Sequence, residues 1–195
     1  MSEQVKNSNP TAYMWGPSSN ITASDYHFTI GGFAQNTAGL VQPAAETVAT
    51  WINSEQHCLP VTKQEIDERE FALYAVTSLK AAPQKGHKDL AVVAFGSLMP
   101  ISDNTGYWEL ASLVTGPQYR GKGVGSAMVE ALTSFFKEYG DNRFEDLCLV
   151  SGPNTVQFYV RHGFTEVNAV LKPDHALFQK QLHATHHNKQ LMMLV

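Results

Sequence analysis

The chain has 195 residues, of which 43% are apolar and 16% are charged, and its formal net charge is −4. This length predicts one domain with a sizeable core, and the mild negative charge gives no general attraction to nucleic acid or anionic membranes. The longest apolar runs are too short to cross a bilayer, the N-terminus has no apolar signal core, and Cys58 and Cys148 supply no disulfide framework. We therefore expect a cytoplasmic globular protein that binds neither nucleic acid nor membranes.

The first half of the chain opens with a segment rich in Asn, Ser, Thr and Pro, residues 1–24, which predicts an N-terminal arm. Thr62 and Glu65 have the spacing of a capping box and predict the start of a short helix. Apolar periodicity and turn residues predict the remaining elements. These are a strand over 26–30 broken by Gly31-Gly32, a helix over about 44–56, a strand over 71–78, a loop over 81–88, a strand over 90–98 and a hairpin turn over 100–106.

The second half is expected to contain a strand over 107–115, a glycine-rich turn, and an amphipathic helix over 124–139 that Gly140 ends. After it we expect strands over 143–150, 164–170 and 175–182, a short helix ending near His162 before Gly163, and a C-terminal tail over 184–195. Residues 25–183 are then a single α/β (α+β) domain. This order of elements fits a mixed, mostly antiparallel central sheet with helices on both faces.

The glycine-rich turn reads Arg120-Gly-Lys-Gly-Val-Gly-Ser126 and immediately precedes the amphipathic helix. The first turn of a helix has unpaired amide donors and a partial positive charge. Glycines let an anion approach these amides without meeting a Cβ, and Arg120 and Lys122 add positive charge. The alternative is a tight turn with no ligand. The spacing matches neither the P-loop nor the dinucleotide-binding pattern, which argues against an unrelated nucleotide-binding protein.

Two sequence blocks, residues 109–125 and 157–164, resemble the GNAT N-acetyltransferase superfamily. In the first block Arg120, Gly123 and Gly125 match the family's coenzyme A-binding motif, and the second block has the family's Tyr and Gly-Phe. The two blocks stand in the family's order. The resemblance covers residues 90 to about 182 and implies a GNAT fold with acetyl-CoA as the acyl donor.

The resemblance also implies positions for the bound donor. The pantetheine arm would pair with the strand that precedes the turn, and the diphosphate would meet amides of the turn itself. Carried over by motif, the cofactor-binding residues are Leu113, Val114, Thr115, Arg120, Gly121, Lys122, Gly123, Val124, Gly125 and Ser126. Asn154 is added because an Asn in this loop contacts the cofactor in the family. It stands two residues closer to the Tyr than usual, so the alternative is that it only caps the helix.

Two residues are candidates for proton transfer. Tyr159 matches the family's general acid for the coenzyme A thiolate, and the alternative is a core aromatic pair with Phe158. Glu109 lies where many members carry a Glu that accepts the proton of the amine, and the alternative is a structural ion pair. His162 and His175 are the other candidate bases. Cys148 lies in an apolar strand and is expected to be packed rather than nucleophilic.

These residues predict an N-acetyltransferase that transfers acetyl from acetyl-CoA to a primary amine of a small molecule or peptide by direct attack. The alternative is a non-catalytic acyl-CoA-binding sensor or interaction module. The histidines near the C-terminus have no Cys or carboxylate to complete a metal site, so no metal is assigned. Acceptor identity, acyl-chain preference and oligomeric state are left open, with a homodimer among the alternatives.

Overall fold

The computed structural model describes residues 21–23, 26–32, 44–55, 58–69, 71–78, 90–101, 106–139 and 146–195. The strands are β1 (Ile21–Ala23), β2 (Tyr26–Gly32), β3 (Phe71–Ser78), β4 (Leu90–Pro100), β5 (Tyr107–Thr115), β6 (Asp146–Ser151), β7 (Phe164–Glu166) and β8 (Gln190–Leu194). The α-helices are α1 (Ala44–Ser54), α2 (Lys63–Asp67), α3 (Val124–Tyr139), α4 (Val156–Val160) and α5 (Phe178–His186). Two short 3₁₀ turns, Pro117–Tyr119 and Pro153–Thr155, precede α3 and α4.

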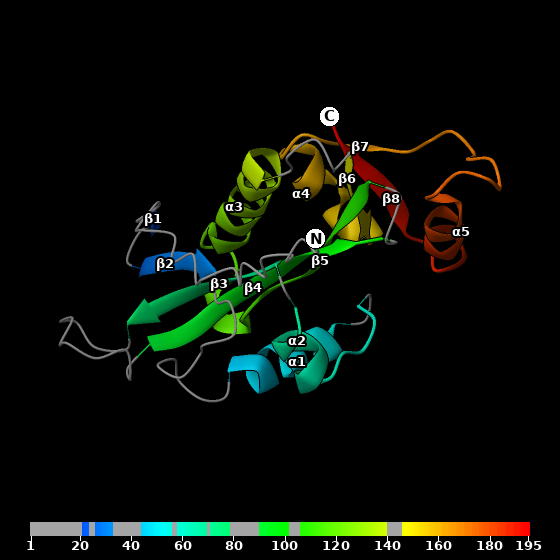
Figure 1. Ribbon diagram of the computed structural model, residues 1–195. Coiled ribbons are helices and arrows are strands. Elements are labelled where there is room, and N and C mark those ends of the chain that lie inside the picture. The colour runs from blue at the N-terminus through cyan, green and yellow to red at the C-terminus, as the bar shows by residue number, and fades with distance from the viewer. Residues whose placement is uncertain are drawn as a thin grey trace, which may run out of the picture.

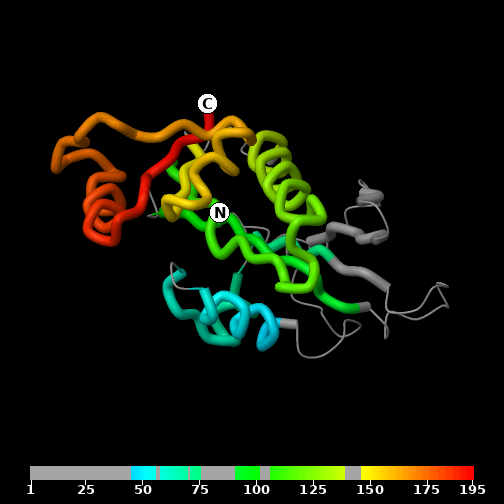
Figure 2. The backbone as a smooth tube through the Cα atoms, turned by 180° about the vertical axis from the view of Figure 1, so that it is seen from behind, coloured from blue at the N-terminus to red at the C-terminus, as the bar shows by residue number. Residues whose placement is uncertain are grey.

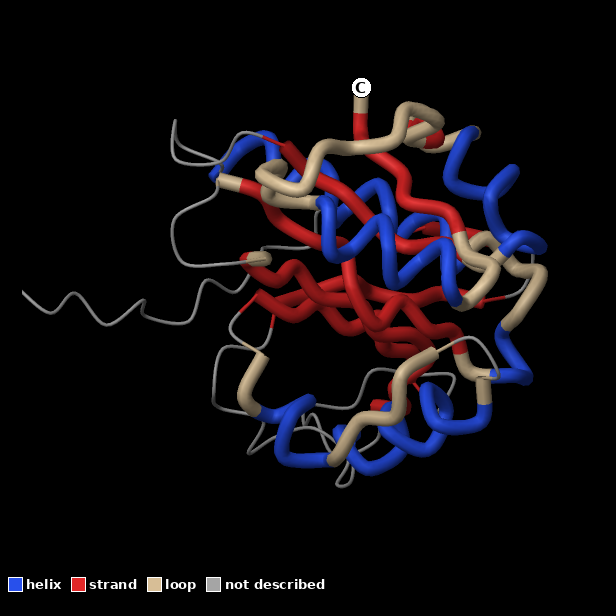
Figure 3. The backbone as a smooth tube through the Cα atoms, turned by 90° about the vertical axis from the view of Figure 1, so that its right-hand side faces the viewer, coloured by secondary structure: helices blue, strands red, loops and turns tan. Residues whose placement is uncertain are grey.

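The described strands form one sheet in the order β1-β2-β3-β4-β5-β6-β8-β7. Every neighbouring pair is antiparallel except β5 and β6, which are parallel. Helices α1 and α2 cover one side of β3–β5 and α3 covers the other (Figures 1 and 3). The expected mixed, mostly antiparallel sheet with helices on both faces is therefore confirmed.

The core has a layer on each side of the sheet because side chains alternate along the strands. Between the sheet and α3, the largest buried side chains include Trp108, Met128, Leu132 and Phe164. Beneath α1 and α2, Ile52, Ile66, Tyr74 and Phe95 form the second layer. A smaller cluster of Cys148, Leu177 and Leu191 lies where α5 packs beside β6 and β8. In the part of the chain that is described, no helix is long and apolar enough to cross a membrane.

Strands β5 and β6 pair only over their first residues. Tyr107, Trp108 and Glu109 lie opposite residues 146–148, and no β6 partner follows for the described residues of β5 beyond Glu109. The far half of β5 also carries a bulge. Its register with β4 shifts between Phe95 and Ser97, and Ser112 within the shift has φ +56°. The two strands therefore diverge into a fork, and the β5 side of this fork is a strand edge without a pairing partner among the described residues.

The C-terminal region differs from the prediction. The strand expected over 175–182 is wrong, because α5 covers Phe178–His186. The strand expected over 164–170 ends at Glu166, since β7 pairs only with the short β8. Residues 184–195 are not a tail, because β8 inserts between β6 and β7 and buries Leu191 and Met192. Figure 2 shows this last strand, in red, beside β6, in yellow.

Most elements before residue 163 agree with the sequence analysis. Strands β3 and β5 and helix α3 have the predicted bounds, and the capping box of α2 is present. Gly31 and Gly32 do not break the first predicted strand but extend it as part of β2. Strand β6 begins at Asp146 within its described residues. Within the arm predicted over 1–24, Ile21–Ala23 forms β1. Residues 1–20, the loop over 81–88, the turn residues 102–105 and the Gly140 cap lie outside the described residues.

Candidate functional site

The glycine-rich turn leads from β5 into α3 and leaves a series of backbone amides without acceptors. Gly121 and Gly123 have φ of +73° and +78°, a conformation that glycine adopts at least cost, and a Cβ added to either would meet no atom within 4 Å. The first backbone bond at this end of α3 runs from the Ala127 amide to the Gly123 carbonyl. Among the described residues, the amides of Gly121, Gly123, Val124, Gly125 and Ser126 have no hydrogen-bond acceptor.

Such an arrangement is suited to an anion, because several N–H groups at a helix N-terminus have no competing partner and the space beside them is open. Gly125 lies differently, with an ordinary φ. A Cβ there would contact the Thr115 hydroxyl at 3.5 Å and Phe158 at 3.7 Å. The turn therefore has an open side at Gly121 and Gly123 and a packed side at Gly125.

Arg120 holds the start of the turn against α1. Its Nε donates to the Thr115 carbonyl over 3.2 Å, and its guanidinium forms an ion pair with Glu55, just after α1. Part of its charge is thus already matched by a carboxylate. Lys122 lies on the turn between Gly121 and Gly123 and is partly exposed, so it adds a second positive charge beside the open amides.

The β5 edge leads from the fork to this turn. Val114 and Thr115 pair with Phe95 and Ala94 of β4 on one side, while Leu113 lies in the bulge without a directly opposite residue. Because backbone groups of an antiparallel strand point alternately to its two sides, some N–H and C=O groups of this segment face the fork. An extended ligand could add here as a strand does and continue to the α3 amides.

Tyr159 of α4 lies in the aromatic packing on the α3 side of the fork, with Phe158 at 5.0 Å and Phe164 at 6.0 Å between ring centroids. Burial raises the pKa of Tyr159 to about 12, and the nearby Cys58 thiol adds a smaller effect in the same direction. Cys58 belongs to the loop between α1 and α2.

Glu109 lies on β5 at the last residue that pairs with β6. Its Oε2 accepts a hydrogen bond from Lys180 Nζ of α5 over 2.6 Å, and both side chains are largely shielded, with 20% and 28% exposed. The alternative role of Glu109, a structural ion pair, therefore has Lys180 as its partner. Its Oε1 has no hydrogen-bond partner among the described residues, which leaves one oxygen for a further donor.

The remaining candidates lie in different surroundings. Asn154 is exposed in the 3₁₀ turn before α4 and makes no capping bond. His162 contacts the Ser126 hydroxyl at 3.2 Å, between α3 and α4. His175 Nδ1 accepts from the Leu177 amide at 3.1 Å. Cys148 is fully buried, and burial raises its pKa to about 12, with Glu109 contributing in the same direction. No group of three or more possible metal ligands occurs among the described residues.

Two cations near Glu109, Lys180 and Arg69, were not among the candidates predicted from the sequence. Lys180 was assigned to a strand, and its position depends on α5 packing beside β6. Arg69 follows α2, and its only sequence signal was its place one turn after the capping-box Glu65. Glu109 partly offsets the lowering of the Arg69 pKa by burial. Glu109 and Lys180 also act on the pKa of His183, in opposite directions.

A family model described as Acetyltransferase (GNAT) family matches residues 46–164, more than half of the chain. The search of curated proteins found no match. Among solved structures, Rv2747 from Mycobacterium tuberculosis, in complex with CoA and NLQ, is 15% identical with a TM-score of 0.58, over 80% of this chain and 96% of that chain. N-acetylglutamate synthase from Neisseria gonorrhoeae, complexed with coenzyme A and N-acetyl-glutamate, is 14% identical with a TM-score of 0.57, over 87% and 35%. Ard1 from Thermoplasma volcanium is 17% identical with a TM-score of 0.54, over 85% and 95%.

Proposed function

The chain belongs to the GNAT acetyltransferase family, and we propose that it transfers an acetyl group from acetyl-CoA to a primary amine of a small molecule or peptide. The observation that carries this proposal is the series of α3 amides without acceptors, which faces open space at the end of the unpaired β5 edge. A diphosphate fits the amides, and an extended pantetheine arm fits the strand edge. Two of the similar structures are complexes with coenzyme A.

In this proposal each part of the site has one task. The amides of Gly121 to Ser126, assisted by Lys122, bind the phosphates, and Asn154 is a peripheral contact. Leu113, Val114 and Thr115 orient the donor along β5, while Arg120 holds the turn in place through Thr115 and Glu55. Acetyl-CoA supplies the acetyl group as an activated thioester. Binding the donor both by its phosphates and along its pantetheine arm restricts its motion and favours direct attack by a bound amine.

Proton transfer is assigned to two side chains, Glu109 of β5 and Tyr159 of α4. The amine must lose a proton to become nucleophilic, and the free Oε1 of Glu109 would accept it directly or through a water. Tyr159 would donate its proton to the leaving thiolate. Its pKa of about 12 keeps the phenol protonated at neutral pH. Since thiols have a pKa of about 8.5, this transfer is uphill by itself, and we expect Tyr159 to give only a modest rate advantage.

The second candidate function is an acyl-CoA-binding module without turnover. The ion pair between Lys180 and Glu109 favours it, because the carboxylate then has a structural partner within the chain. The two candidates share the donor site and differ only in what happens after the donor binds.

One experiment with two measurements separates them. Thermal shift with acetyl-CoA, coenzyme A, ATP and NAD tests the donor site, and a ligand at 100 times its Kd should add about 2.7 kcal/mol of stability. Release of the coenzyme A thiol with a panel of primary amines then tests transfer. Stabilisation by acetyl-CoA together with amine-dependent thiol release supports the enzyme. Stabilisation without release supports the binding module, and stabilisation by ATP or NAD alone refutes both.

A further inference from the structure

Building on the proposed function, we propose that Arg69 binds a carboxylate of the acceptor, so that the amine substrate is an amino-carboxylic acid rather than a simple cationic amine. The proposal rests on three features of the α2 side of the sheet. These are the anchored backbone of Arg69, the guanidinium donors that have no partner among the described residues, and the two cations near Glu109.

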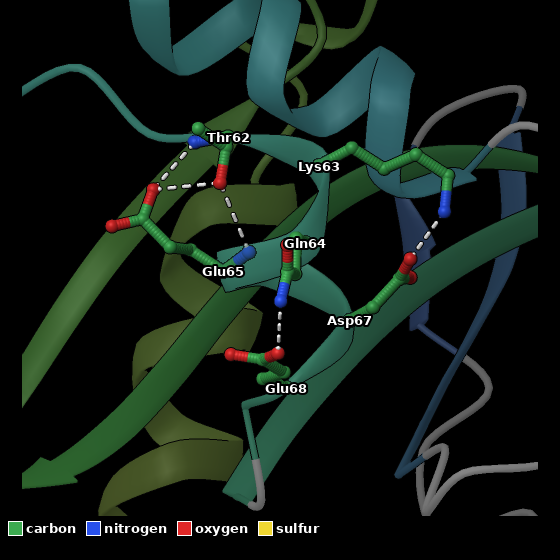
Figure 4. Close-up of polar contacts among 6 residues, drawn as sticks. All are labelled: Thr62, Lys63, Gln64, Glu65, Asp67 and Glu68. Carbon is green, nitrogen blue, oxygen red and sulfur yellow. Dashed lines mark hydrogen bonds and ion pairs between the residues drawn. The ribbon is translucent and has the colours of Figure 1, made fainter.

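Arg69 is held in place by a short but well-anchored helix. At the start of α2, Thr62 Oγ1 accepts from the Glu65 amide over 3.2 Å, and Glu65 Oε2 accepts from the Thr62 amide over 2.6 Å (Figure 4). Ile66 is 1% exposed and fixes the inner face of the helix in the core. The Arg69 amide then donates to the Ile66 carbonyl over 3.3 Å. The backbone from which Arg69 extends is therefore well determined.

The Arg69 side chain reaches down to the sheet beside the β5 bulge. Its Nη1 lies 3.4 Å from the hydroxyl of Ser97, which is fully buried on β4. That hydroxyl in turn donates to the Ala111 carbonyl of β5 over 3.2 Å. Ala111 is two residues beyond Glu109, so both face the same side of the sheet. Arg69 is thus near the point where the fork opens.

The guanidinium has more donors than the described residues use. Arg69 Nε donates to the Glu65 carbonyl over 3.2 Å, and the longer contact to Ser97 is the other bond. An arginine has five N–H groups, and within the described ranges Arg69 forms no ion pair with a carboxylate. Its side chain is half-buried, and burial lowers its pKa. A partly desolvated guanidinium with free donors is best satisfied by a carboxylate, which matches its planar fork.

The charges around the fork favour an acceptor that carries both signs. Arg69 and Lys180 are positive, Glu109 is negative, and Lys180 already pairs with Glu109 over 2.6 Å. The carboxylate of Glu65, which also acts on Arg69, is bound to Thr62 by the capping box. Among the described residues no carboxylate therefore contacts the Arg69 guanidinium directly, and a purely cationic amine gains nothing from this cation. An amino acid would place its amine toward Glu109 and its carboxylate on Arg69.

The test compares amino acids with their amides. Glycine, β-alanine, γ-aminobutyrate and glutamate are assayed beside the corresponding amides, with rates normalised to the fraction of neutral amine. For at least one pair we expect wild-type kcat/KM to be at least tenfold higher for the acid. Arg69→Gln should abolish this preference, mainly through a KM for the acids at least tenfold higher, with a much smaller effect on acetylation of the amides. Arg69→Lys should restore part of the preference, because it keeps the charge but loses the fork.

Arg161→Gln is the matched control, because Arg161 is exposed after α4 and should keep the wild-type preference. Thermal shift supplies a readout independent of turnover. The preferred acid should stabilise the acetyl-CoA-saturated wild type and Arg161→Gln, but not Arg69→Gln. Equal use of acids and amides by the wild type, or an unchanged preference in Arg69→Gln, overturns the proposal while the acetyltransferase stands. Absence of acetylation of any amine overturns the proposed function together with this inference.

Discussion

The open side of the glycine turn allows the proposed diphosphate site to be tested with two nearly isosteric variants, Gly123→Asp and Gly123→Asn. Gly123 has φ +78°, and a Cβ there would enter open space. Asn and Asp both visit this left-handed region, so each variant carries a similar backbone strain, up to about 1–2 kcal/mol. The side chains have nearly the same size. The pair therefore differs chiefly by one negative charge at the position proposed for the phosphates.

The expected effect of that charge follows from Coulomb's law. Two like charges about 5 Å apart at an effective dielectric constant near 20 repel by about 3 kcal/mol, which corresponds to roughly a hundredfold in affinity. We expect Gly123→Asp to bind coenzyme A about a hundredfold more weakly than Gly123→Asn, with similar melting temperatures for the two unliganded proteins. Raising the salt concentration should narrow the gap.

Titration calorimetry with coenzyme A measures the two dissociation constants directly. Gly125→Ala serves as a control for altering a glycine in the same turn, because a Cβ at Gly125 meets only ordinary contacts at 3.5 Å and 3.7 Å. This variant should bind coenzyme A within a few-fold of wild type. Equal affinities of Gly123→Asp and Gly123→Asn, with both proteins folded, would show that no anion binds at the open amides.

Three further predictions concern catalysis and stability. Tyr159→Phe should lower kcat about tenfold with little change in the KM for acetyl-CoA, and an unchanged kcat would assign the thiolate's proton to another donor. Because the pKa of Tyr159 is about 12, its phenol stays protonated, and Tyr159 should cause no alkaline loss of the wild-type rate between about pH 7 and 10. Thr62→Ala removes the capping box and should cost about 1 kcal/mol, lowering the melting temperature by about 2–4 °C, whereas Thr50→Ala on the exposed side of α1 should have a smaller effect. Truncation after Lys189 removes β8, and with it Leu191 and Met192, so cooperative thermal unfolding should be lost; a truncated protein that melts like wild type would contradict the role of β8 in the sheet.

Local signals explain why much of the proposed donor site could be predicted. The apolar periodicity of the sequence predicts helix α3. The glycines before it indicate a turn that needs their backbone freedom, and Gly121 and Gly123 indeed have φ of +73° and +78°. The capping box of α2 is likewise a contact between residues three positions apart. The family resemblance then selected Glu109 and Tyr159 as candidates, and the structure has Glu109 at the last residue of β5 that pairs with β6 and Tyr159 in α4. All of these inferences depend on neighbours in the chain, which a single sequence displays directly.

The amino-acid sequence by itself thus determined the glycine turn, the helix that follows it and the strand that leads to it, because their conformations depend on nearby residues. Only the tertiary structure decided the C-terminal region. Gln190–Leu194 becomes a strand because β6 and β7 supply its backbone partners, and α5 then brings Lys180 to Glu109 from 71 positions away. The same holds for Arg69, whose contact with Ser97 spans 28 positions. Long-range pairing and charge placement have no signature in local sequence, since they arise only when the sheet has formed.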